Sequence, residues 1–182
     1  MKGNDKTMNE RIHDATLYED IPSPEGREEK EMAVYRLLKE LQIPYERLDH
    51  EPMETMEACQ DVDKLLHIHM CKNLFLCNRQ KTNFYLLMMP GDKPFKTKEL
   101  SHQLGIARLS FASPEDMEQY LDCTPGSSSI MGLANDAENK VQLLMDEDIK
   151  AGEYLGCHPC INTSSLKLRT ADVLETFLPA VH

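Results

Sequence analysis

The chain has 182 residues, of which 41% are hydrophobic and 28% charged, and this fits one packed domain with or without a tail. A net charge of −11 argues against a protein that coats a nucleic-acid backbone, because such proteins neutralise many phosphates with lysine and arginine. No apolar run approaches the roughly 20 residues of a membrane helix. The polar N-terminus also lacks a secretory signal, so we expect a cytoplasmic protein, away from membranes, whose six cysteines stay reduced.

The first 25 residues differ in character from the rest of the chain. Residues 1–25 are polar, and a break rich in proline and glycine lies at Ile21–Gly26. Segments of this kind at a chain end are poorly ordered unless something ties them down. We therefore predict a loosely ordered N-terminal extension over residues 1–25, followed by one domain over residues 26–182.

The elements of the domain are predicted from apolar periodicity and from turn and capping residues. In chain order they are a helix over Arg27–Leu41, a strand over Tyr45–Asp49, a helix over Thr55–Leu66, strands over Lys72–Asn78 and Asn83–Met89, a helix over Lys96–Leu104, a strand over Ala107–Ala112, a helix over Pro114–Leu121, strands over Lys140–Met145 and Ser165–Leu168, and a helix over Thr170–Phe177. Ser113 and Thr170 are predicted N-caps, whereas Gly105 and Pro179 are predicted to end helices. Thr124–Leu133 and Gly156–Ser164 are predicted loops.

Two of these strands are nearly continuous in apolar residues. Lys72–Asn78 and Asn83–Met89 flank a polar turn, which predicts a central hairpin covered on both faces. Strands and helices alternate irregularly along the whole chain. We therefore predict an α/β (α+β) fold, a single compact domain with a mixed β-sheet surrounded by helices.

The charge is distributed unevenly. The segment from Lys72 to Arg108 holds seven basic and two acidic residues, whereas the rest of the chain is strongly acidic. A local basic face could hold the phosphate-rich end of a ligand, and it could equally be a solvated hairpin and helix. The asymmetry alone favours neither interpretation.

Three polar spots interrupt the apolar pattern. Lys72 heads a buried strand, where it could stabilise an oxyanion or hold a phosphate, or extend its stem to water at the strand edge. The loop Pro125–Gly132 offers glycines and backbone N–H groups to a ligand, or is a flexible turn. In Gly156–Thr163, His158 and Asn162 could position a water or a substrate hydroxyl, or belong to a proline turn.

Two further patterns point to other chemistry. Cys157 and Cys160 have the C-x-x-C spacing of a dithiol redox site, but they lie late in the chain between strands, unlike a thioredoxin-type site. A pattern of imidazoles and thiols that could ligate zinc is formed by His67, His69, Cys71 and Cys77. The two cysteines of this second pattern stand at opposite ends of a strand, about 20 Å apart, too far for one ion.

Four stretches of the sequence, in order and in register, resemble the YbaK/ProX family, also called the prolyl-tRNA synthetase-associated domain. The stretches are Cys71-Lys-Asn-Leu-Phe-Leu76, Arg108-Leu-Ser-Phe-Ala-Ser-Pro-Glu115, Thr124-Pro-Gly-Ser-x-Ser129 with Gly132-Leu133, and Gly156-x-His-Pro-x-x-Asn-Thr163. The resemblance extends from about Met32 to the C-terminus. It looks closest to the free-standing PrdX/ProX branch, whose members clear Ala-tRNA(Pro).

The resemblance implies a role for each motif residue. Catalytic roles are implied for Lys72, Gly126, Ser127, Ser128, Ser129 and His158. Contacts with the substrate are implied for Asn73, Ile130, Met131, Gly132, Leu133, Pro159, Asn162 and Thr163. Lys72 would engage the 3′-terminal nucleotide, the loop that begins at Gly126 would frame the reacting carbonyl, and the motif around His158 would lie near the amino-acid pocket.

The chain departs from the family at three positions. Ile130 stands where the family usually has proline, Met131 replaces phenylalanine, and Ser165 replaces threonine. The first change bears on the rigidity of the loop, and all three bear on the size of the amino-acid pocket. They affect the choice of amino acid more than the type of reaction.

The resemblance predicts a trans-editing deacylase that binds the acceptor end of mischarged tRNA(Pro), most simply Ala-tRNA(Pro), with transient contact to prolyl-tRNA synthetase. Direct attack by water is expected, with no metal and no cofactor, because no Ser–His–Asp arrangement is visible. Two alternatives stay open: a dithiol redox protein that uses Cys157 and Cys160, and a non-catalytic tRNA- or nucleotide-binding module. The residues carry no signal for an oligomeric state.

Overall fold

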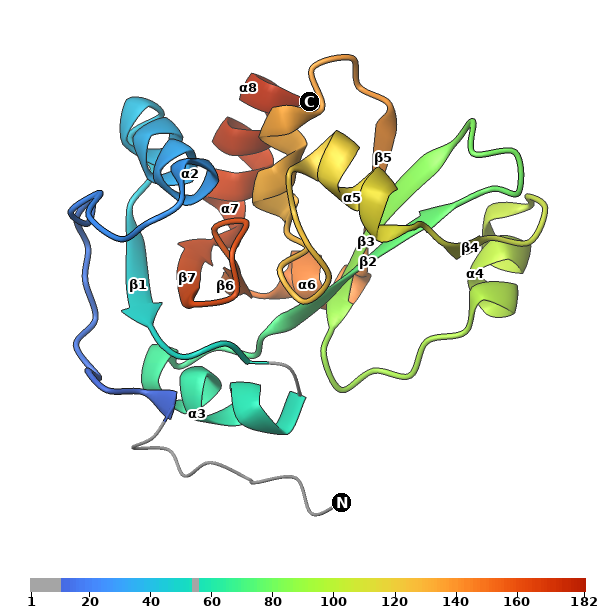
Figure 1. The fold of residues 1–182 in the computed structure, drawn as a ribbon. Helices are drawn as coiled ribbons and strands as arrows, with labels where there is room; N and C mark the ends of the chain where they lie inside the picture. Colours follow the sequence, from blue (N-terminus) through green and yellow to red (C-terminus); the bar gives the residue numbers. More distant parts are fainter. Residues whose placement is uncertain (1–10, 54–55) are drawn as a thin grey trace, which may run out of the picture.

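A computed structural model describes residues 11–53 and 56–182 of the chain (Figure 1). Its helical elements are α2 (Glu29–Glu40), α3 (Met56–Leu66), α4 (Thr97–Leu104), α5 (Pro114–Leu121), the 3-10 helix η1 (Ile130–Asn135), α6 (Glu147–Ala151), α7 (Thr170–Asp172), the π-helical turn η2 (Val173–Phe177) and α8 (Leu178–Val181). Its strands are β1 (Tyr45–Asp49), β2 (Cys71–Cys77), β3 (Phe84–Pro90), β4 (Ser110–Phe111), β5 (Val141–Met145), β6 (Tyr154–Cys157) and β7 (Ser164–Arg169). None of the helices in these ranges has the length and apolar content needed to span a bilayer.

The seven strands form two small sheets. One is antiparallel with the order β1-β7-β6, and the other has the order β4-β2-β3-β5, in which only the β3–β5 pair is parallel. An isolated bridge between Met70 and Gly156 joins the start of β2 to β6. The predicted α/β fold with mixed strands is confirmed, and its strands are divided between two sheets that meet at this bridge.

The predicted central hairpin is confirmed by the burial of β3. Every residue from Phe84 to Met89 is buried, with alternate side chains on opposite faces as the two-residue period of a strand requires. Phe84, Leu86 and Met88 pack into the main core, which α2, α5 and the C-terminal helices cover. The side chains between them pack on the other face with Leu100 and Leu104 of α4, on the right in Figure 1.

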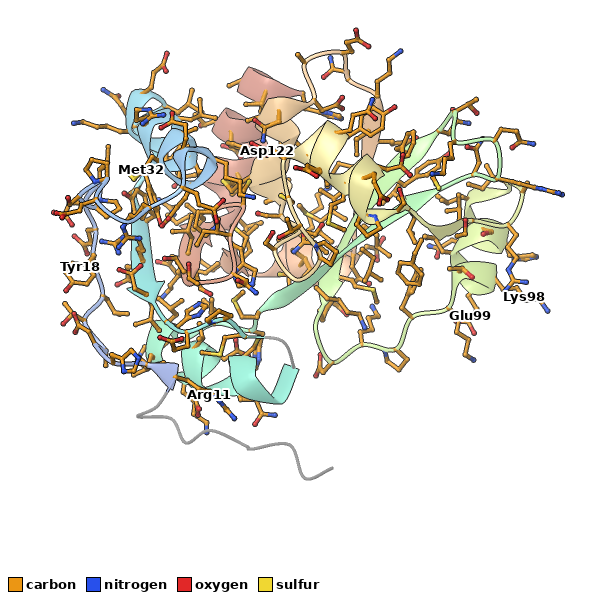
Figure 2. The ribbon with its side chains drawn as sticks, viewed as in Figure 1. Arg11, Tyr18, Met32, Lys98, Glu99 and Asp122 are labelled. Carbon is orange, nitrogen blue, oxygen red and sulfur yellow. The ribbon has the colours of Figure 1, made fainter. Side chains whose placement is uncertain are left out.

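Part of the predicted N-terminal extension lies against the domain. Residues 1–10 fall outside the described residues, but Ile12 is buried beside Leu48 and Val62. Tyr18, labelled in Figure 2, exchanges two backbone hydrogen bonds with Arg47 of β1. Contacts therefore hold the described part of the extension in place, whereas the sequence suggested a loosely ordered segment. The domain boundary at residue 26 stays a prediction.

The sequence missed or misjudged the shortest elements. The predicted loops hide most of η1 and the second half of β6, whose first half was not predicted, and α6 was not predicted at all. The strand predicted over Ala107–Ala112 shrinks to Ser110–Phe111, because β4 is an edge strand that pairs only with Leu76 and Cys77. Thr55 of the second predicted helix lies outside the described residues. A strand of two residues and helices of one or two turns are too short to show a period.

The end of the chain corrects two predicted helix signals. The N-cap is Arg169, and Thr170 is already the first helical residue. The N–H of Thr170 still bonds to the carbonyl of Glu153, so the helix begins directly where β7 ends. Pro179 does not end the helix. It lies in the first turn of α8, beyond the π-helical turn, where a missing N–H leaves no helical bond unmade.

Candidate functional site

A cavity of about 340 Å³ opens where β2 begins, beside the bridge that joins the two sheets. Its lining comes from the residues before α3 and from α3 itself, from β2, from the β4–α5 junction, from the Gly/Ser loop and from the His158 loop. The lining residues are Met53, Cys59, Met70, Cys71, Lys72, Asn73, Leu74, Phe75, Phe111, Ala112, Met117, Pro125, Gly126, Ser128 and His158. The structure therefore brings all three polar spots of the sequence together.

Lys72 and Asn73 reach the cavity from opposite faces of β2. Lys72 shares a face with Leu74, and its Nζ donates to the backbone carbonyl of Lys93. Asn73 points to the other face, where its Oδ1 is buried and finds no hydrogen-bond partner among the described residues. An unpartnered buried amide oxygen costs free energy that a ligand donor could recover.

The Gly/Ser loop turns its serines in alternating directions. Ser127 is buried, and its Oγ donates to the carbonyl of Thr124 at 2.9 Å. The Oγ of buried Ser129 donates to the carbonyl of His158 at 2.5 Å and accepts the N–H of Met131 at 3.1 Å. Between them, Ser128 lines the cavity, and its Oγ has no hydrogen-bond partner within residues 11–53 and 56–182. Ser127 and Ser129 thus hold the loop in shape, whereas the hydroxyl of Ser128, buried in the wall of the cavity, is left for a ligand to satisfy.

Gly126 and its neighbours carry the backbone groups of the loop. Gly126 has φ +90°, a conformation that L side chains rarely adopt. The N–H of Ser127 is used in the turn, since it donates to the carbonyl of Thr124 at 2.9 Å. Of the four backbone N–H groups from Gly126 to Ser129, that of Ser127 is therefore already committed to the turn.

His158 is held in one tautomer. Its Nδ1 lies 2.8 Å from the carbonyl oxygen of Ser164, and because a carbonyl only accepts, Nδ1 carries the proton. This leaves Nε2 as an acceptor on a ring that lines the cavity. Burial lowers the pKa of His158, which favours the neutral ring.

A second histidine lies behind His158. The rings of His50 and His158 meet edge to face with centroids 6.2 Å apart. Ser165, where the family usually has threonine, joins them: its Oγ is 2.8 Å from Nε2 of His50 and 3.5 Å from Nδ1 of His158. Burial lowers the pKa of His50 to about 4, so both rings are neutral near pH 7.

Several predicted contact residues do not line the cavity. Ile130, Met131 and Leu133 are core side chains that are at most 1% exposed, and a Cβ on Gly132 would meet the carbonyl oxygen of Leu121 at 2.8 Å. They belong to η1, which the apolar core holds in place.

The rest of the His158 motif also lies outside the lining. Pro159 is buried, and the carbonyl of Thr163 accepts the N–H of His50 at 2.9 Å. Asn162 stands behind Gly126, with its Nδ2 3.6 Å from the place of a Cβ there. These residues support the loops that carry Gly126 and His158.

The two alternative patterns are not assembled into reactive sites. Cys157 and Cys160 are both fully buried free thiols. Burial raises the pKa of Cys157 to about 12, and a hydrogen bond with Cys123 together with burial holds the pKa of Cys160 well above its usual value. A dithiol redox site needs an accessible thiol of low pKa, so this environment argues against one.

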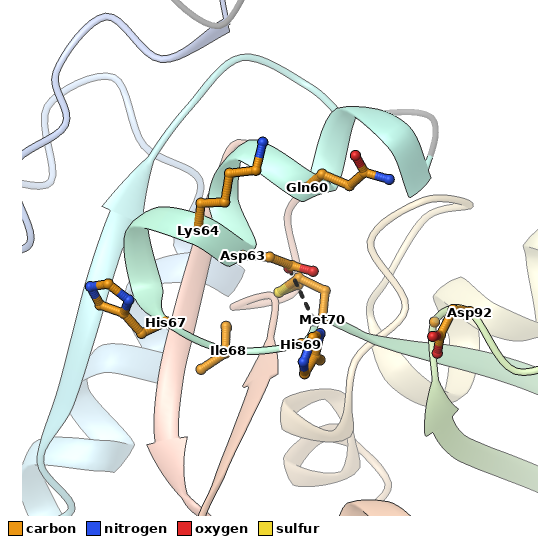
Figure 3. A pocket seen from close by; sticks show the side chains of 9 residues that line it. Gln60, Asp63, Lys64, His67, Ile68, His69, Met70 and Asp92 are labelled. Carbon is orange, nitrogen blue, oxygen red and sulfur yellow. Dashed lines mark hydrogen bonds between the residues drawn. The ribbon is translucent and has the colours of Figure 1, made fainter.

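The histidines of the zinc pattern line a second, adjoining cavity (Figure 3). His67 and His69 lie there with Asp63, which accepts the N–H of Met70 at 3.0 Å. Cys71 and Cys77 stand at opposite ends of β2. Within the described ranges, no three histidine, cysteine or acidic side chains are grouped as a metal site requires.

Sequence reasoning missed the apolar wall of the cavity. Met53, Met70 and Met117 line it together with Cys59 and Phe111. They come from four separate parts of the chain and share no motif or period. Only the folded chain brings them together.

The geometry defines a class of protein: an α/β domain with a cavity that offers a lysine, a neutral histidine, and an amide, a hydroxyl and loop N–H groups that have no partner among the described residues. The family described as the aminoacyl-tRNA editing domain matches residues 50–176, and the chain belongs to this family. The predicted family is thereby confirmed.

Individual relatives agree with this assignment. "Prolyl-tRNA editing protein ProX" of Acetoanaerobium sticklandii is 30% identical over 141 residues, which cover 78% of this chain and 86% of that protein. "Prolyl-tRNA synthetase associated domain-containing protein 1" of Danio rerio is 28% identical over 140 residues, 76% of each chain. A solved structure described as a candidate trans-editing enzyme for prolyl-tRNA synthetase superposes with a TM-score of 0.61 over 81% of this chain and 90% of its own. Because the identity is 11%, this likeness shows the fold alone.

Proposed function

We propose that this chain is a trans-editing deacylase that hydrolyses the ester of mischarged tRNA(Pro), with alanine as the amino acid removed. The observation that carries the proposal is the cavity itself, in which Lys72, Asn73, Ser128 and His158 converge in a member of the editing-domain family. The names of the relatives support tRNA(Pro) as the substrate and transient contact with prolyl-tRNA synthetase.

The terminal adenosine would enter at the start of β2. Lys72 would exchange its bond to the Lys93 carbonyl for a phosphate or hydroxyl of the terminal nucleotide. The buried Oδ1 of Asn73 would accept a hydroxyl or the α-ammonium group of the substrate. Both contacts would orient the ester without taking part in bond making.

The Gly/Ser loop would receive the developing negative charge. As water attacks the carbonyl, its oxygen becomes an oxyanion, and the N–H groups of Gly126, Ser128 and Ser129 remain for it once that of Ser127 is set aside. The hydroxyl of Ser128 can add a fourth donor, since it has no partner in the described part of the chain. Bonds to Thr124 and His158 fix the loop, so the donors are organised before the substrate arrives.

His158 would orient the attacking water. Its neutral ring, with the proton on Nδ1, offers Nε2 as the acceptor for one proton of that water. An aminoacyl ester is already activated, so one acceptor and one free ribose hydroxyl suffice to align the attack. The ester C–O bond then breaks, and the proton from water goes to the departing ribose oxygen.

Selection of the amino acid would fall to the apolar wall. The residues that the family resemblance assigned to this task, Ile130 and Met131 among them, lie in the core. Met53, Met70 and Met117 face the cavity instead. Exclusion of the larger proline ring by such a wall can be strong, whereas one extra methylene contributes only about 1–3 kcal/mol.

The test is hydrolysis of radiolabelled Ala-tRNA(Pro), with Pro-tRNA(Pro), Ser-tRNA and Cys-tRNA(Pro) alongside. We expect loss of alanine and sparing of proline, with the rate reduced about 100-fold or more in Lys72→Ala. Lys150→Ala, an exposed lysine on α6, is the matched control and should keep full activity.

Three outcomes would contradict the proposal in whole or in part. Hydrolysis of none of these esters above the uncatalysed rate, with tRNA still bound, would favour the non-catalytic binding module. Removal of another amino acid would keep the reaction and reject alanine. Activity that survives Cys157→Ser and Cys160→Ser together is expected, and loss of activity without loss of folding would revive the redox alternative.

A further inference from the structure

A shallow basic depression adjoins the cavity on the side of β4. Its volume is about 660 Å³, and it is lined by Arg79, Thr97, Arg108, Leu109, Ser110 and Phe111. Phe111 belongs to the lining of both hollows, so the depression and the cavity are neighbours that share this side chain. In Figure 1 the region lies around β4, beside α4.

Phe111 is unusually exposed for a large apolar side chain. It is 59% exposed, more than Tyr154 at 43% and Ile106 at 38%. Its ring meets that of Phe95 edge to face, with centroids 6.0 Å apart. The strand pairing with Leu76 and the bond from the N–H of Ala112 to the carbonyl of Phe75 fix its backbone. The chain therefore holds an aromatic ring in solvent on a rigid support.

The fold pairs several basic side chains of the segment from Lys72 to Arg108 with acidic ones. Lys81 pairs with Asp116, Lys93 with Asp146 and Asp148, and Lys96 with Glu99. In contrast, the exposed side chains of Arg79 and Arg108 have no ion pair or hydrogen bond with any described residue. Two uncompensated guanidinium groups thus remain in the depression of an otherwise acidic protein, available for an anionic partner.

The exposed ring of Phe111 forms a path between the cavity and the depression. Phe111 pairs with Leu76 of β2, four residues along the strand from Lys72, and because Leu76 is itself buried, the exposed route between the two hollows runs over the Phe111 ring, which lines both. Lys72 and Leu76 are about 14 Å apart, a separation that a short stretch of single-stranded RNA can span. Arg79 follows the other end of β2, so the path leads from the cavity, past an exposed ring, to positive charge.

We propose that this path binds the unpaired nucleotides that precede the terminal adenosine of tRNA, with a base stacked on Phe111 and backbone phosphates on Arg79 and Arg108. Stacking on an aromatic ring tolerates any base, and arginine forks fit phosphates. An acidic protein surface would satisfy the arginines, but it would not need a flat ring at the mouth of the cavity. This inference rests on the proposed function, and it identifies the surface that would hold the acceptor end of the tRNA.

The first test measures RNA binding without catalysis. The probe is a short fluorescent single-stranded RNA ending in CCA, titrated at several salt concentrations. Phe111→Ala and Phe111→Leu should weaken binding about 5- to 100-fold, and Phe111→Tyr, which keeps the flat ring, should not. Arg108→Gln should lower the salt slope by about 0.7. The controls are Tyr154→Ala, another exposed aromatic, and Lys39→Gln on α2.

The second test compares two esters. Arg108→Gln, whose side chain lines only the depression, should lower kcat/KM for Ala-tRNA(Pro) and leave hydrolysis of 3′-O-alanyl-adenosine unchanged, because that ester lacks the preceding nucleotides and their phosphates. Equal loss on both esters in Arg108→Gln would overturn the inference. Unchanged RNA binding in Phe111→Ala and Arg108→Gln would also overturn it and leave the depression to an acidic protein. A wild-type protein that binds the RNA through Phe111 but hydrolyses neither ester would instead reject the proposed function alone.

Discussion

At the scale of single residues, the buried histidines couple the fold to pH. His50 donates from Nδ1 to the carbonyl of Glu51, and its Nε2 lies 2.8 Å from Oγ of Ser165, so the neutral ring satisfies both partners. Burial lowers its pKa from 6.5 to about 4. The unfolded chain therefore binds the proton first as the pH falls.

The sign of the pH effect follows from this difference. The stabilisation from His50 is present above pH 6.5 and is lost progressively as the pH falls towards about 4, with a total of about 3 kcal/mol. We expect His50→Gln, whose amide can donate and accept in the same places, to flatten the decline in the free energy of unfolding in this window. Urea unfolding at pH 7, 6 and 5 measures it. His102→Gln, an exposed histidine, should follow the wild-type decline.

Two glycines in one segment should respond to alanine for different reasons, one through backbone strain and one through a steric clash. Gly126 has φ +90°, and a Cβ there would make only an ordinary contact, at 3.6 Å, with Nδ2 of Asn162, so the cost of Gly126→Ala should come from the backbone: a strain of about 1–2 kcal/mol in the loop and a loss of ester hydrolysis of roughly tenfold or more. At Gly132 the Cβ would meet the carbonyl of Leu121 at 2.8 Å, so Gly132→Ala should cost about 1–3 kcal/mol of stability. Thermal unfolding and initial rates on both variants separate the effects. Equal activity losses would show that the two positions act together.

How much of the site the sequence could predict depends on the kind of residue. Lys72 and His158 were predictable because a lysine heading an apolar strand and a histidine in a polar loop break local patterns. Which serine of the loop faces the cavity was not predictable, because Ser127 and Ser129 differ from Ser128 only in their tertiary bonds. The sequence also could not show which residues of η1 contact the substrate and which belong to the core, because burial there depends on packing against Leu121.

At the scale of elements, a buried charge network joins α2, β1 and β7. Arg27 donates to Glu31 at 2.6 Å and to Asp49 at 2.8 Å, and Arg47 also donates to Asp49. Ser164 adds a bond to Asp49 at 2.5 Å. Although burial opposes the charged form, these bonds together lower the pKa of Asp49 to about 2.

Removing one member of this network should be costly. Arg47 is 3% exposed, and its guanidinium lies 4.7 Å from the ring centre of Tyr18. Arg47→Ala should therefore destabilise the domain by about 3–5 kcal/mol, because a carboxylate loses its buried partner. Arg36→Ala breaks the exposed pair with Glu29 and should cost about 0–1 kcal/mol. Denaturant unfolding of both measures the contrast, and similar losses would show that burial does not set the strength.

Elements that carry their own pattern were the ones predicted well. The strand Tyr45–Asp49 was placed correctly, and Ser113 caps α5 with the reciprocal bonds of a capping box to Asp116. Strand β6 gains its form from β7, with which Leu155 and Cys157 pair, and so it left no local signal. The helix that runs past Pro179 depends on a π-helical turn, which residue propensities do not predict.

At the scale of the whole molecule, the charge distribution and the burial of the thiols distinguish the proposed deacylase from the redox protein and from the non-catalytic binding module. An acidic protein with one basic path should bind tRNA weakly, through the acceptor end, and with an affinity that falls with salt. Five of the six cysteines are buried, and Cys59, half-buried, lines the cavity. The accessibility of each thiol therefore reports on the site as well as on the fold.

Alkylation of the native protein should modify Cys59 before any other cysteine. Burial and the nearby Asp63 raise the pKa of Cys59, so the reaction with iodoacetamide should be slow, but the remaining thiols should react only after unfolding. Mass spectrometry should show one adduct in buffer and six in denaturant, and Cys59→Ser should show none in buffer. A non-hydrolysable alanyl-adenosine amide that fills the cavity should protect Cys59. Rapid labelling of Cys157 or Cys160, or a disulfide between them under mild oxidation, would contradict the buried C-x-x-C and favour the redox protein over the deacylase.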